Sequence, residues 1–268
     1  MTEPPSRGTT AHELHGRHVL VTGGASGIGA ELVRDLAARG ARVTIADRDE
    51  RGARAVAEEV AGRELILDVT DAAAWDRAAA TIGPLDMACL NAGTASGTPD
   101  LEALDVATCE RLLRTNIDGV VLGLRALLAH DALVEGAVVL VSASLAGLTP
   151  MPSDPLYAAT KHATVGLVRS MAPGLADRGV RIQAVCPGIV DTPMLDGPAR
   201  DRLQASGFPL IPIDDVVAGA RAALRSDGTG EAWVVQAGRP PEPYAFRGVP
   251  GPRVPGAHGL TPPGVPGG

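Results

Sequence analysis

The strongest indication of the fold in this sequence is the segment Thr22-Gly23-Gly24-Ala25-Ser26-Gly27-Ile28-Gly29. A short apolar run at residues 18–21 precedes it, and residues 28–39 follow with apolar side chains at helical spacing. The glycines therefore lie in a turn between a strand and a helix. This position disfavours an ordinary flexible turn and favours a phosphate-binding turn at the start of an α/β fold.

The glycines of this turn have separate uses in such a site. Gly23 permits a tight turn, whereas Gly27 and Gly29 let backbone and helix approach a pyrophosphate closely. The helix start, with Ser26 and Ile28, offers free N–H groups and the positive end of the helix dipole. The spacing Gly-X-X-X-Gly-X-Gly differs from the commoner Gly-X-Gly-X-X-Gly, so the turn alone is weak evidence. Its place after the first strand predicts a dinucleotide site.

Strands and helices alternate along the rest of the chain. Further strands are predicted at residues 42–46, 65–67, 86–90, 137–141, 180–185 and 232–236. Helices are predicted at residues 50–61, 71–82, within 101–133 and at 155–177, where Pro173 is expected to end or kink the helix. The alternation predicts the α/β class: a single doubly wound Rossmann-type domain with a parallel sheet of about seven strands and helices on both faces.

Both ends of the chain depart from this alternation. Residues 1–15 are polar and are predicted to be a flexible segment, and residues 16–237 form the dinucleotide-binding oxidoreductase domain. Residues 238–268 form a tail rich in proline and glycine, a composition typical of disorder. Alternatively, the tail is an arm that lies across a neighbouring subunit or the active-site mouth. Tyr244 and Phe246 favour anchoring as far as residue 253, with disorder beyond it.

Composition excludes several classes of function. The net charge of −7 argues against nucleic acid and against an anionic membrane surface as partners. The sequence shows neither an apolar run of transmembrane length nor a signal peptide. Cys89, Cys109 and Cys186 are far apart and odd in number, which favours reduced thiols in a cytoplasmic protein. The sequence shows no metal-ligand spacing, so no metal site is predicted. Because aromatic residues make up only 2%, a substrate pocket would be lined mainly by aliphatic side chains.

The end of the second predicted strand bears on the choice of cofactor. Asp47 lies eighteen positions after Gly29, near the offset at which a carboxylate meets the adenosine ribose. A carboxylate there binds the ribose hydroxyls and repels a 2′-phosphate, which favours NAD over NADP. Arg48 could accept that phosphate, so NADP remains the alternative. Asp49 can cap the following helix and leave Asp47 free for the ribose.

Tyr157 and Lys161 lie one turn apart on the same face of a predicted helix. A free tyrosine has a pKa of ~10, which is too high for a good base at neutral pH. The positive charge of Lys161, with that of an oxidised nicotinamide, is expected to favour tyrosinate and lower that pKa. Alone, a Tyr-X-X-X-Lys pair is more often a solvated helix face. With the glycine-rich turn, it predicts proton transfer coupled to hydride transfer by a nicotinamide.

In their order along the chain, these motifs resemble the short-chain dehydrogenase/reductase family over residues 16–236. The family's cofactor turn matches residues 22–29, its adenine-contacting pair Asp68-Val69, and its motif after the fourth strand Asn91-Ala92-Gly93. Its helix asparagine matches Asn116 and its active-site residues match Ser144, Tyr157 and Lys161; its nicotinamide-side segment matches Pro187, Gly188, Val190 and Thr192. Any one match could arise by chance, but the ordered series is specific.

The resemblance implies a role for each matched catalytic residue. Ser144 would orient the substrate oxygen, with Ser142 as the competing choice; the interval of thirteen residues from Ser144 to Tyr157 suits the family. Lys161 would also bind the nicotinamide ribose, and Asn116 would help to hold a water that links Lys161 to solvent. Asp154, three residues before Tyr157, is expected to cap the helix, with contact to substrate as the lesser alternative.

The resemblance also implies a mobile substrate lid at about residues 193–212. The apolar content of this segment favours a hydrophobic small molecule. The function predicted is an NAD-dependent oxidoreductase that interconverts a secondary alcohol and a ketone. The alternatives are an NADP-dependent ketone reductase and a catalytically silent dinucleotide-binding protein. Gln236-Ala237-Gly238 stands where the family often carries Asp-Gly-Gly, so the end of the domain departs from the pattern.

Two predicted helices favour self-association. The helix after Asn116 and the helix at residues 155–172 carry more small and aliphatic side chains than covering a sheet requires. Similar helices pair between subunits in the resembling family. A homodimer or homotetramer with two-fold symmetry is therefore expected.

Overall fold

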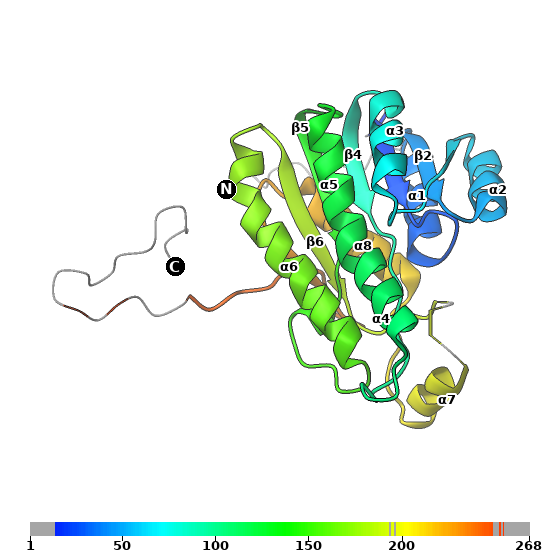
Figure 1. Ribbon diagram of the computed structural model, residues 1–268, viewed down its shortest axis with the longest axis vertical. Coiled ribbons are helices and arrows are strands. Elements are labelled where there is room, and N and C mark those ends of the chain that lie inside the picture. The colour runs from blue at the N-terminus through cyan, green and yellow to red at the C-terminus, as the bar shows by residue number, and fades with distance from the viewer. Residues whose placement is uncertain (1–13, 193, 196, 249–251, 253, 255–268) are drawn as a thin grey trace, which may run out of the picture.

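A central parallel sheet organises the computed structural model, which describes residues 14–192, 194–195, 197–248, 252 and 254 (Figure 1). Its strands lie in the order β3-β2-β1-β4-β5-β6-β7-β8. The bounds are β1 His18–Thr22, β2 Arg42–Asp47, β3 Arg63–Ile66, β4 Leu85–Leu90, β5 Leu133–Ser142, β6 Arg181–Pro187, β7 Ala232–Val235 and β8 Glu242–Pro243. Strands β1 to β7 are parallel, and β8 is antiparallel to β7. The predicted α/β class and Rossmann-type topology are confirmed.

Helices cover both faces of the sheet. Helices α1 (Gly27–Ala38), α2 (Glu50–Val60) and α8 (Ile213–Arg225) pack on one face. Helices α3 (Ala72–Ile82), α5 (Gly119–Ala129) and α6 (Pro155–Ala176) pack on the other, with α4 (Val106–Leu113) beside α6 (Figure 1). Helix α7 (Gly197–Ala205) stands apart from both layers.

The first strand shows why the sheet is buried on both faces. Val19 and Val21 pack in the cluster that contains α1, whereas Leu20 between them packs in the cluster that contains α5 and α6. All three side chains are fully buried. A strand whose side chains alternate between two apolar layers reads as a continuous apolar run, which is the pattern predicted for a parallel sheet.

Some elements differ from the prediction for physical reasons. Within residues 101–133, helix α4 begins only at Val106 because Asp105 caps it by accepting from the N–H of Thr108. A π-helical turn, η1 (Arg114–Asp118), then joins α4 to α5. Pro173 does not end α6, which continues to Ala176. Its exposed ring lies in the last turn, where the proline removes one hydrogen bond close to a helix end. Helix α8 was not predicted.

The first part of the tail adds to the sheet. β8 pairs with β7, and the N–H of Tyr244 donates to the carbonyl of Ala232 at 2.7 Å. The rings of Tyr244 and Phe246 meet edge to face at 4.9 Å, and the Arg169 guanidinium lies 3.7 Å from the Phe246 ring centre. These two aromatic residues anchor the tail to β7 and α6 of its own chain. The sheet thus extends beyond the predicted boundary at residue 237.

The predictions of flexibility and disorder concern the two ends of the chain. Residues 1–13 and 255–268, where flexibility and disorder are predicted, lie outside the described residues. Leu14, in contrast, is buried against the sheet layer that contains α1. Over the described ranges, no helix is both long enough and apolar enough to cross a membrane.

Candidate active site

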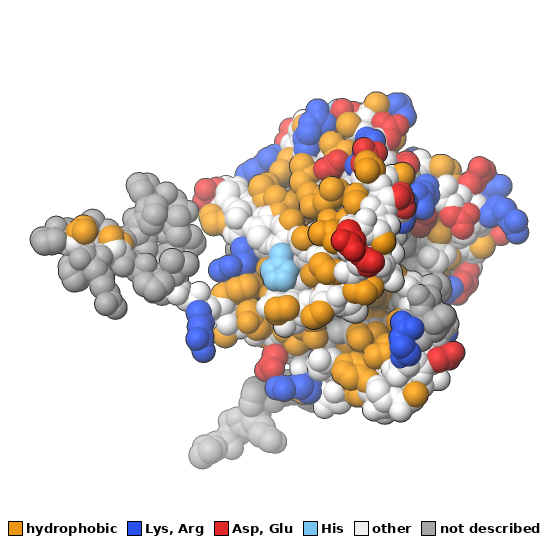
Figure 2. Space-filling model, turned by 60° about the horizontal axis from the view of Figure 1, so that its bottom comes forward, with side chains coloured by type: hydrophobic (Ala, Val, Ile, Leu, Met, Phe, Trp, Pro, Cys, Tyr) orange, Lys and Arg blue, Asp and Glu red, His pale blue; other side chains and the backbone are white. Residues whose placement is uncertain are grey.

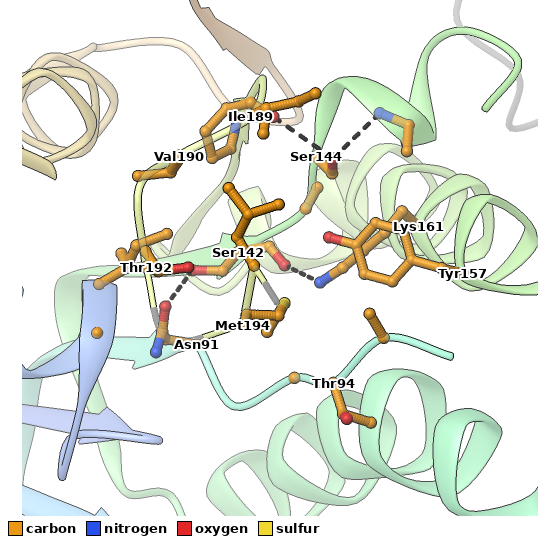
Figure 3. Close-up of a pocket in the computed structure, with 18 of the residues that line it drawn as sticks. Asn91, Thr94, Ser142, Ser144, Tyr157, Lys161, Ile189, Val190, Thr192 and Met194 are labelled. Carbon is orange, nitrogen blue, oxygen red and sulfur yellow. Dashed lines mark hydrogen bonds between the residues drawn. The ribbon is translucent and has the colours of Figure 1, made fainter. Parts of the chain in front are cut away.

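A cavity of about 940 Å³ lies at the carboxyl ends of the central strands. In an open parallel sheet this edge is the usual ligand site, at the point where the strand order reverses between β1 and β4. The cavity extends from the glycine-rich turn to α7, and its middle part contains Asn91, Ser144, Tyr157 and Lys161 (Figure 3).

Nearly all the predicted site residues line this one cavity. They are Gly23, Ser26, Gly27, Ile28, Asp47, Arg48, Asp68, Val69, Asn91, Ala92, Gly93, Ser144, Tyr157, Lys161, Pro187, Gly188, Val190 and Thr192. Gly29 and Asn116 do not line it. The topology therefore gathers residues from seven separate stretches of the sequence into a single site.

Gly29 matters for packing. A Cβ built on Gly29 would lie 2.0 Å from the carbonyl oxygen of Gly23, so no side chain fits there. Gly23 has φ +65°, and a Cβ built on it would lie 2.9 Å from Cα of Ala92. The turn and α1 are thus in backbone contact with each other and with the loop after β4. Gly29 shapes the site by this close approach.

The N-terminus of α1 is open to the cavity. Ser26 occupies its N-cap position, and among the described side chains none caps it, while its first turn carries no acidic residue. Helices α2, α3, α4 and α6 instead begin at aspartates whose side chains accept from their own first turns. Free N–H groups and a positive dipole end suit a pyrophosphate. This open helix start and the glycine turn fit a dinucleotide.

The far end of the cavity carries paired charges. One oxygen of Asp47 accepts from the N–H of Ala25 at 3.1 Å and the other from the N–H of Asp49 at 3.0 Å. Asp49 caps α2, as predicted. The pKa of Asp68 is lowered, chiefly by the N–H of Thr70, and the nearby charge of Arg48 contributes. Arg48 therefore faces a second carboxylate in addition to its neighbour Asp47.

The two candidate serines have different environments. The Ser142 hydroxyl donates to Oδ1 of Asn91 at 2.8 Å, and its carbonyl accepts from Nζ of Lys161 at 2.7 Å (Figure 3). Ser142 thereby joins the ends of β4 and β5. The Ser144 hydroxyl accepts from the N–H of Ala146 at 3.1 Å and donates to the carbonyl of Pro187 at 3.4 Å, and it lies near enough to Tyr157 to lower the tyrosine pKa. Ser144, the favoured choice, is thus the serine beside Tyr157.

Burial sets the pKa values of Tyr157 and Lys161. It raises the pKa of Tyr157 to about 12, and the Ser144 hydroxyl only partly opposes this rise. Lys161 lies with Nζ 5.5 Å from the Tyr157 ring centre, and its own pKa is lowered by burial to about 8. Among the protein's own groups burial therefore dominates, and the lowering of the tyrosine pKa by Lys161 together with an oxidised nicotinamide stays a prediction. Burial dominates because it disfavours the charged form of both groups.

Asn116 lies in the π-helical turn η1 and is fully buried. Its side-chain oxygen accepts from the N–H of Thr94 at 2.8 Å, and its amide donates to the carbonyl of Thr94 at 2.8 Å and to Oγ1 of Thr160 at 3.0 Å. These contacts tie the loop after β4 to α6. Asn116 thus acts on the arrangement of the cavity wall, and π-helical turns of this kind recur at functional sites.

Apolar side chains line the substrate end of the cavity. Met194 and Phe208 are 53% and 43% exposed although both are large and apolar. They flank α7, within the predicted lid. Further lining residues that the sequence did not single out are Thr94, Leu145, Met151, Arg111, Arg202 and Leu203. No sequence motif marks them, because tertiary packing brings them to the cavity from η2 (Leu145–Gly147), from α4, from α7 and, for Thr94 and Met151, from loops.

The model of the family described as short chain dehydrogenase matches residues 17–202 of this chain. The chain belongs to the short-chain dehydrogenase family. The match covers the glycine-rich turn, Asn91, Asn116, Ser144, Tyr157 and Lys161. Among the described residues of this short-chain dehydrogenase, no group of His, Cys, Asp or Glu is arranged to hold a metal ion.

Two curated relatives are named as dehydrogenases of hydroxylated compounds. The cis-4-hydroxycyclohexanecarboxylate dehydrogenase of Sinomonas cyclohexanicum is 43% identical over 226 residues, which are 79% of this chain and 90% of that protein. The 3-alpha-(or 20-beta)-hydroxysteroid dehydrogenase of Mycobacterium tuberculosis is 36% identical over 84% of this chain and 90% of that protein.

A solved structure extends the comparison to the cofactor. The 3-ketoacyl-(acyl-carrier-protein) reductase from Brucella melitensis, complexed with NADH, superimposes with a TM-score of 0.77 and 30% identity. The alignment covers 85% of this chain and 99% of that one. This short-chain dehydrogenase is therefore an oxidoreductase that uses a nicotinamide dinucleotide.

Proposed function

We propose that this enzyme is an NAD-dependent dehydrogenase that interconverts a secondary alcohol and a ketone of a hydrophobic small molecule. One observation carries the proposal: a single cavity joins the open N-terminus of α1 to Ser144, Tyr157 and Lys161. A catalytically silent dinucleotide-binding protein would need the first of these features and not the second.

Each catalytic side chain has a role that follows from its position. Tyr157 carries the proton to or from the substrate oxygen, and Ser144 orients that oxygen because its hydroxyl lies beside the tyrosine. Lys161 binds the nicotinamide ribose. Asn116 supports a water that links Lys161 to solvent, and it holds the loop that contains Thr94. A bound nicotinamide supplies the hydride acceptor or donor.

The raised pKa of Tyr157 has a direct consequence for this mechanism. With a pKa of about 12 the tyrosine keeps its proton at neutral pH, so it is already in the form that protonates a ketone. For alcohol oxidation, the protein needs a further positive charge beside Tyr157 to stabilise tyrosinate. The oxidised nicotinamide ring has that charge, and protonated Lys161 adds to it.

The charges near the adenosine end support NAD. Asp47 and Asp68 both line the cavity there, and a 2′-phosphate would meet two carboxylates. Arg48 supports the alternative of NADP, because its exposed guanidinium could turn toward a phosphate. Its interaction with Asp68 opposes such a movement. We therefore place NAD first and NADP second.

The lining of the cavity supports a hydrophobic substrate. Met151, Met194, Leu203 and Phe208 surround the end of the cavity that lies beyond Tyr157. Because the two relatives are named for a hydroxycyclohexane and a hydroxysteroid, we propose a cyclic secondary alcohol as the substrate class. The lid at about residues 193–212 would close over it, since α7 carries part of this lining.

We further propose that the enzyme is a cytoplasmic homodimer or homotetramer. Apolar side chains gather over the middle of the face that α5 and α6 share, with most charged side chains around its rim (Figure 2). Val121 of α5 is 41% exposed although it is large and apolar. An apolar face of this kind suits pairing with a second copy.

A spectrophotometric screen tests the proposed function. The full chain is mixed with NAD or NADP and a panel of cyclic and acyclic secondary alcohols, and the absorbance band of reduced nicotinamide is followed. The reverse reaction is tested with the matching ketones. We expect turnover with cyclic alcohols and NAD. Cofactor binding without turnover on any alcohol or ketone would favour the silent dinucleotide-binding protein instead.

A further inference from the structure

Asp154 makes more contacts than a helix cap needs. Its carboxylate is only 3% exposed at the N-terminus of α6. One oxygen accepts from the N–H of Tyr157 at 3.0 Å, which is the capping bond, and from Oγ of Ser96 at 2.6 Å. The other accepts from the N–H groups of Ser96 and Gly97, both at 2.9 Å. Three of the four bonds therefore bind a different segment of the chain.

That segment is a wall of the cavity. Thr94, Ala95 and Gly97 line it, and the successive N–H groups of Ser96 and Gly97 converge on one carboxylate oxygen. Gly97 has φ +74°, the left-handed region that allows such a turn. Convergent backbone N–H groups form an anion-binding nest, and here the anion is Asp154. Without it, the N–H groups of half-buried Ser96 and exposed Gly97 would lose this acceptor.

The wall is fixed at two points, and both lead to α6. Asn116 holds the backbone of Thr94 on both sides and donates to Thr160 of α6. Asp154 holds Ser96 and Gly97, and caps α6 through the N–H of Tyr157. The distance between this wall and Tyr157 is thus set by contacts within one turn of the tyrosine itself.

Asp154 also contributes charge at Tyr157. The groups that face the tyrosine are the Ser144 hydroxyl after β5, Asp154 and Lys161 on α6, and Cys186 on β6. After burial and the Ser144 hydroxyl, Asp154 is the next influence on the tyrosine pKa, which it raises. Burial also raises the pKa of Cys186 to about 12, so that thiol is neutral at neutral pH. Asp154 is then the negative charge among these groups.

We propose that Asp154 is a positioning residue for the reaction, which fixes the wall formed by residues 94–97 relative to Tyr157 and places a negative charge beside it. The wall then holds the substrate ring at a set distance from the tyrosine hydroxyl. The charge helps Tyr157 to keep its proton, the form that protonates a ketone. This inference rests on the proposed function and adds a residue to its machinery.

Two variants distinguish the role of Asp154 in the wall from its role as a helix cap. Asp154→Ser keeps a good N-cap for α6 but cannot reach all three donors of the wall. Asp71→Ser is the matched control, because Asp71 caps α3 by accepting from Ala73 and Ala74 and pairs with Arg77, all of its own helix. We expect Asp154→Ser to lose about tenfold or more in kcat/KM for a cyclic alcohol, since several bonds to a charged group are lost. Its Kd for NAD and the kcat/KM of Asp71→Ser should stay within about twofold of wild type.

A third variant tests the charge. Asp154→Asn removes the negative charge at nearly constant size. Oxidation requires tyrosinate, and loss of a negative neighbour lowers the tyrosine pKa. The acid limb of the profile of kcat/KM against pH should therefore move to lower pH in the oxidation direction. If Asp154 only caps α6 and does not influence Tyr157, the acid limb of Asp154→Asn will lie at the same pH as that of wild type.

Hydrogen exchange tests the wall without any turnover. The amides of Ser96 and Gly97 should be protected in wild type and in Asp71→Ser, and exposed in Asp154→Ser. If wild type turns over no alcohol or ketone, the proposed function fails, while this measurement still decides the contact. Wild-type kcat/KM in Asp154→Ser, or unchanged protection of those amides, would overturn the inference.

A glycine pair covers the case in which Asp154 variants fail to fold. Gly97 and Gly136 have similar positive φ values, +74° and +82°, and no described atom lies within 4 Å of a Cβ built on either. Alanine at the two positions should cost similar stability. Only Gly97→Ala should lower kcat/KM, because Gly136 lies in β5 outside the cavity lining. Equal kinetics of the two variants would contradict the role of the wall.

Discussion

The Nζ atom of Lys161 lies 5.5 Å from the centre of the Tyr157 ring, one helical turn away, and donates to the Ser142 carbonyl. The two side chains share one buried site, yet burial acts on them in opposite directions. It raises the pKa of Tyr157 to about 12 and lowers that of Lys161 to about 8. At neutral pH Tyr157 therefore keeps its proton, while Lys161 is still mostly protonated and remains a positive charge beside it.

Replacing Tyr157 should abolish the chemistry and spare the cofactor. Tyr157→Phe removes the hydroxyl that carries the proton, while the ring still packs beside Lys161. We expect turnover to fall by about 10²–10⁴-fold, the usual contribution of a general acid or base. Steady-state kinetics and a fluorescence titration with NADH measure the two effects. Near-normal turnover in a folded Tyr157→Phe variant would rule out the assigned proton carrier.

The stability of the protein should depend on pH through Lys161. In the folded protein Lys161 loses its proton near pH 8, whereas its ordinary pKa is 10.5. Between these values the unfolded chain binds one more proton, so stability rises with pH. Relative to Lys161→Met, wild type should gain roughly 1–3 kcal/mol between pH 8 and 10. Urea denaturation of both proteins across that range measures the difference in their free energies of unfolding. A difference that does not change with pH would show that burial does not lower the pKa of Lys161.

Cofactor preference should depend on Asp47. Asp47→Ser removes a carboxylate from the adenosine end and leaves Arg48 in place. We expect weaker binding of NAD and tighter binding of NADP, and a change in the ratio of Kd values by about tenfold. Titration of both proteins with both cofactors gives this ratio. If wild type already binds NADP more tightly, Arg48 dominates and NADP is the cofactor.

The glycine-rich turn should tolerate no side chain at Gly29. A Cβ there would overlap the carbonyl of Gly23, so Gly29→Ala should separate α1 from the turn and lower both stability and NAD affinity. Gly166→Ala is the control, because Gly166 lies in α6 with open space around it. Alanine in that helix interior should stabilise the protein by about 0.5–1 kcal/mol. Thermal unfolding and NAD titration compare the two, and equal effects would refute the packing role of Gly29.

The state of assembly can be measured directly. Light scattering at micromolar concentration should give the mass of a dimer or tetramer, and the mass of one chain would refute the proposed association.

Phe246→Ala removes the ring that stacks on Arg169 and should lower the free energy of unfolding by roughly 1–2 kcal/mol. An unchanged unfolding curve would mean that the tail does not anchor to α6 in solution.

Local sequence patterns were enough to predict the sheet and the glycine-rich turn, and the resemblance to the family supplied most of the other predicted residues that line the cavity. The strand ends place Asp47, Asn91 and Ser144 at one edge because parallel strands share a direction, and this follows from alternation alone. The spacing of Tyr157 and Lys161 fixes one helix face in the same way. These features depend on neighbours in sequence, so periodicity reveals them.

Other features depend on tertiary packing and could not be predicted. Asp154 meets Ser96 across 58 positions of sequence, and no motif marks that pair. The pKa of Tyr157 is set by burial, which spacing does not reveal. The sequence predicts a cofactor-binding role for Gly29. The close contact between Gly29 and the carbonyl of Gly23 forms only in the folded backbone, so the sequence did not reveal it. Pro173 continues α6 because its exposed ring lies in the last turn.

The proposed hydride transfer between a nicotinamide and a ketone can be followed with a deuterium label. The enzyme is given NADH that carries deuterium at the reactive carbon of the nicotinamide, together with a panel of cyclic ketones, and the products are analysed by mass spectrometry. We predict an alcohol with one deuterium on the carbinol carbon for wild type and none above background for Tyr157→Phe. Absence of deuterated alcohol from every ketone, with NADH shown to bind, would contradict the assignment of this protein as an alcohol–ketone dehydrogenase.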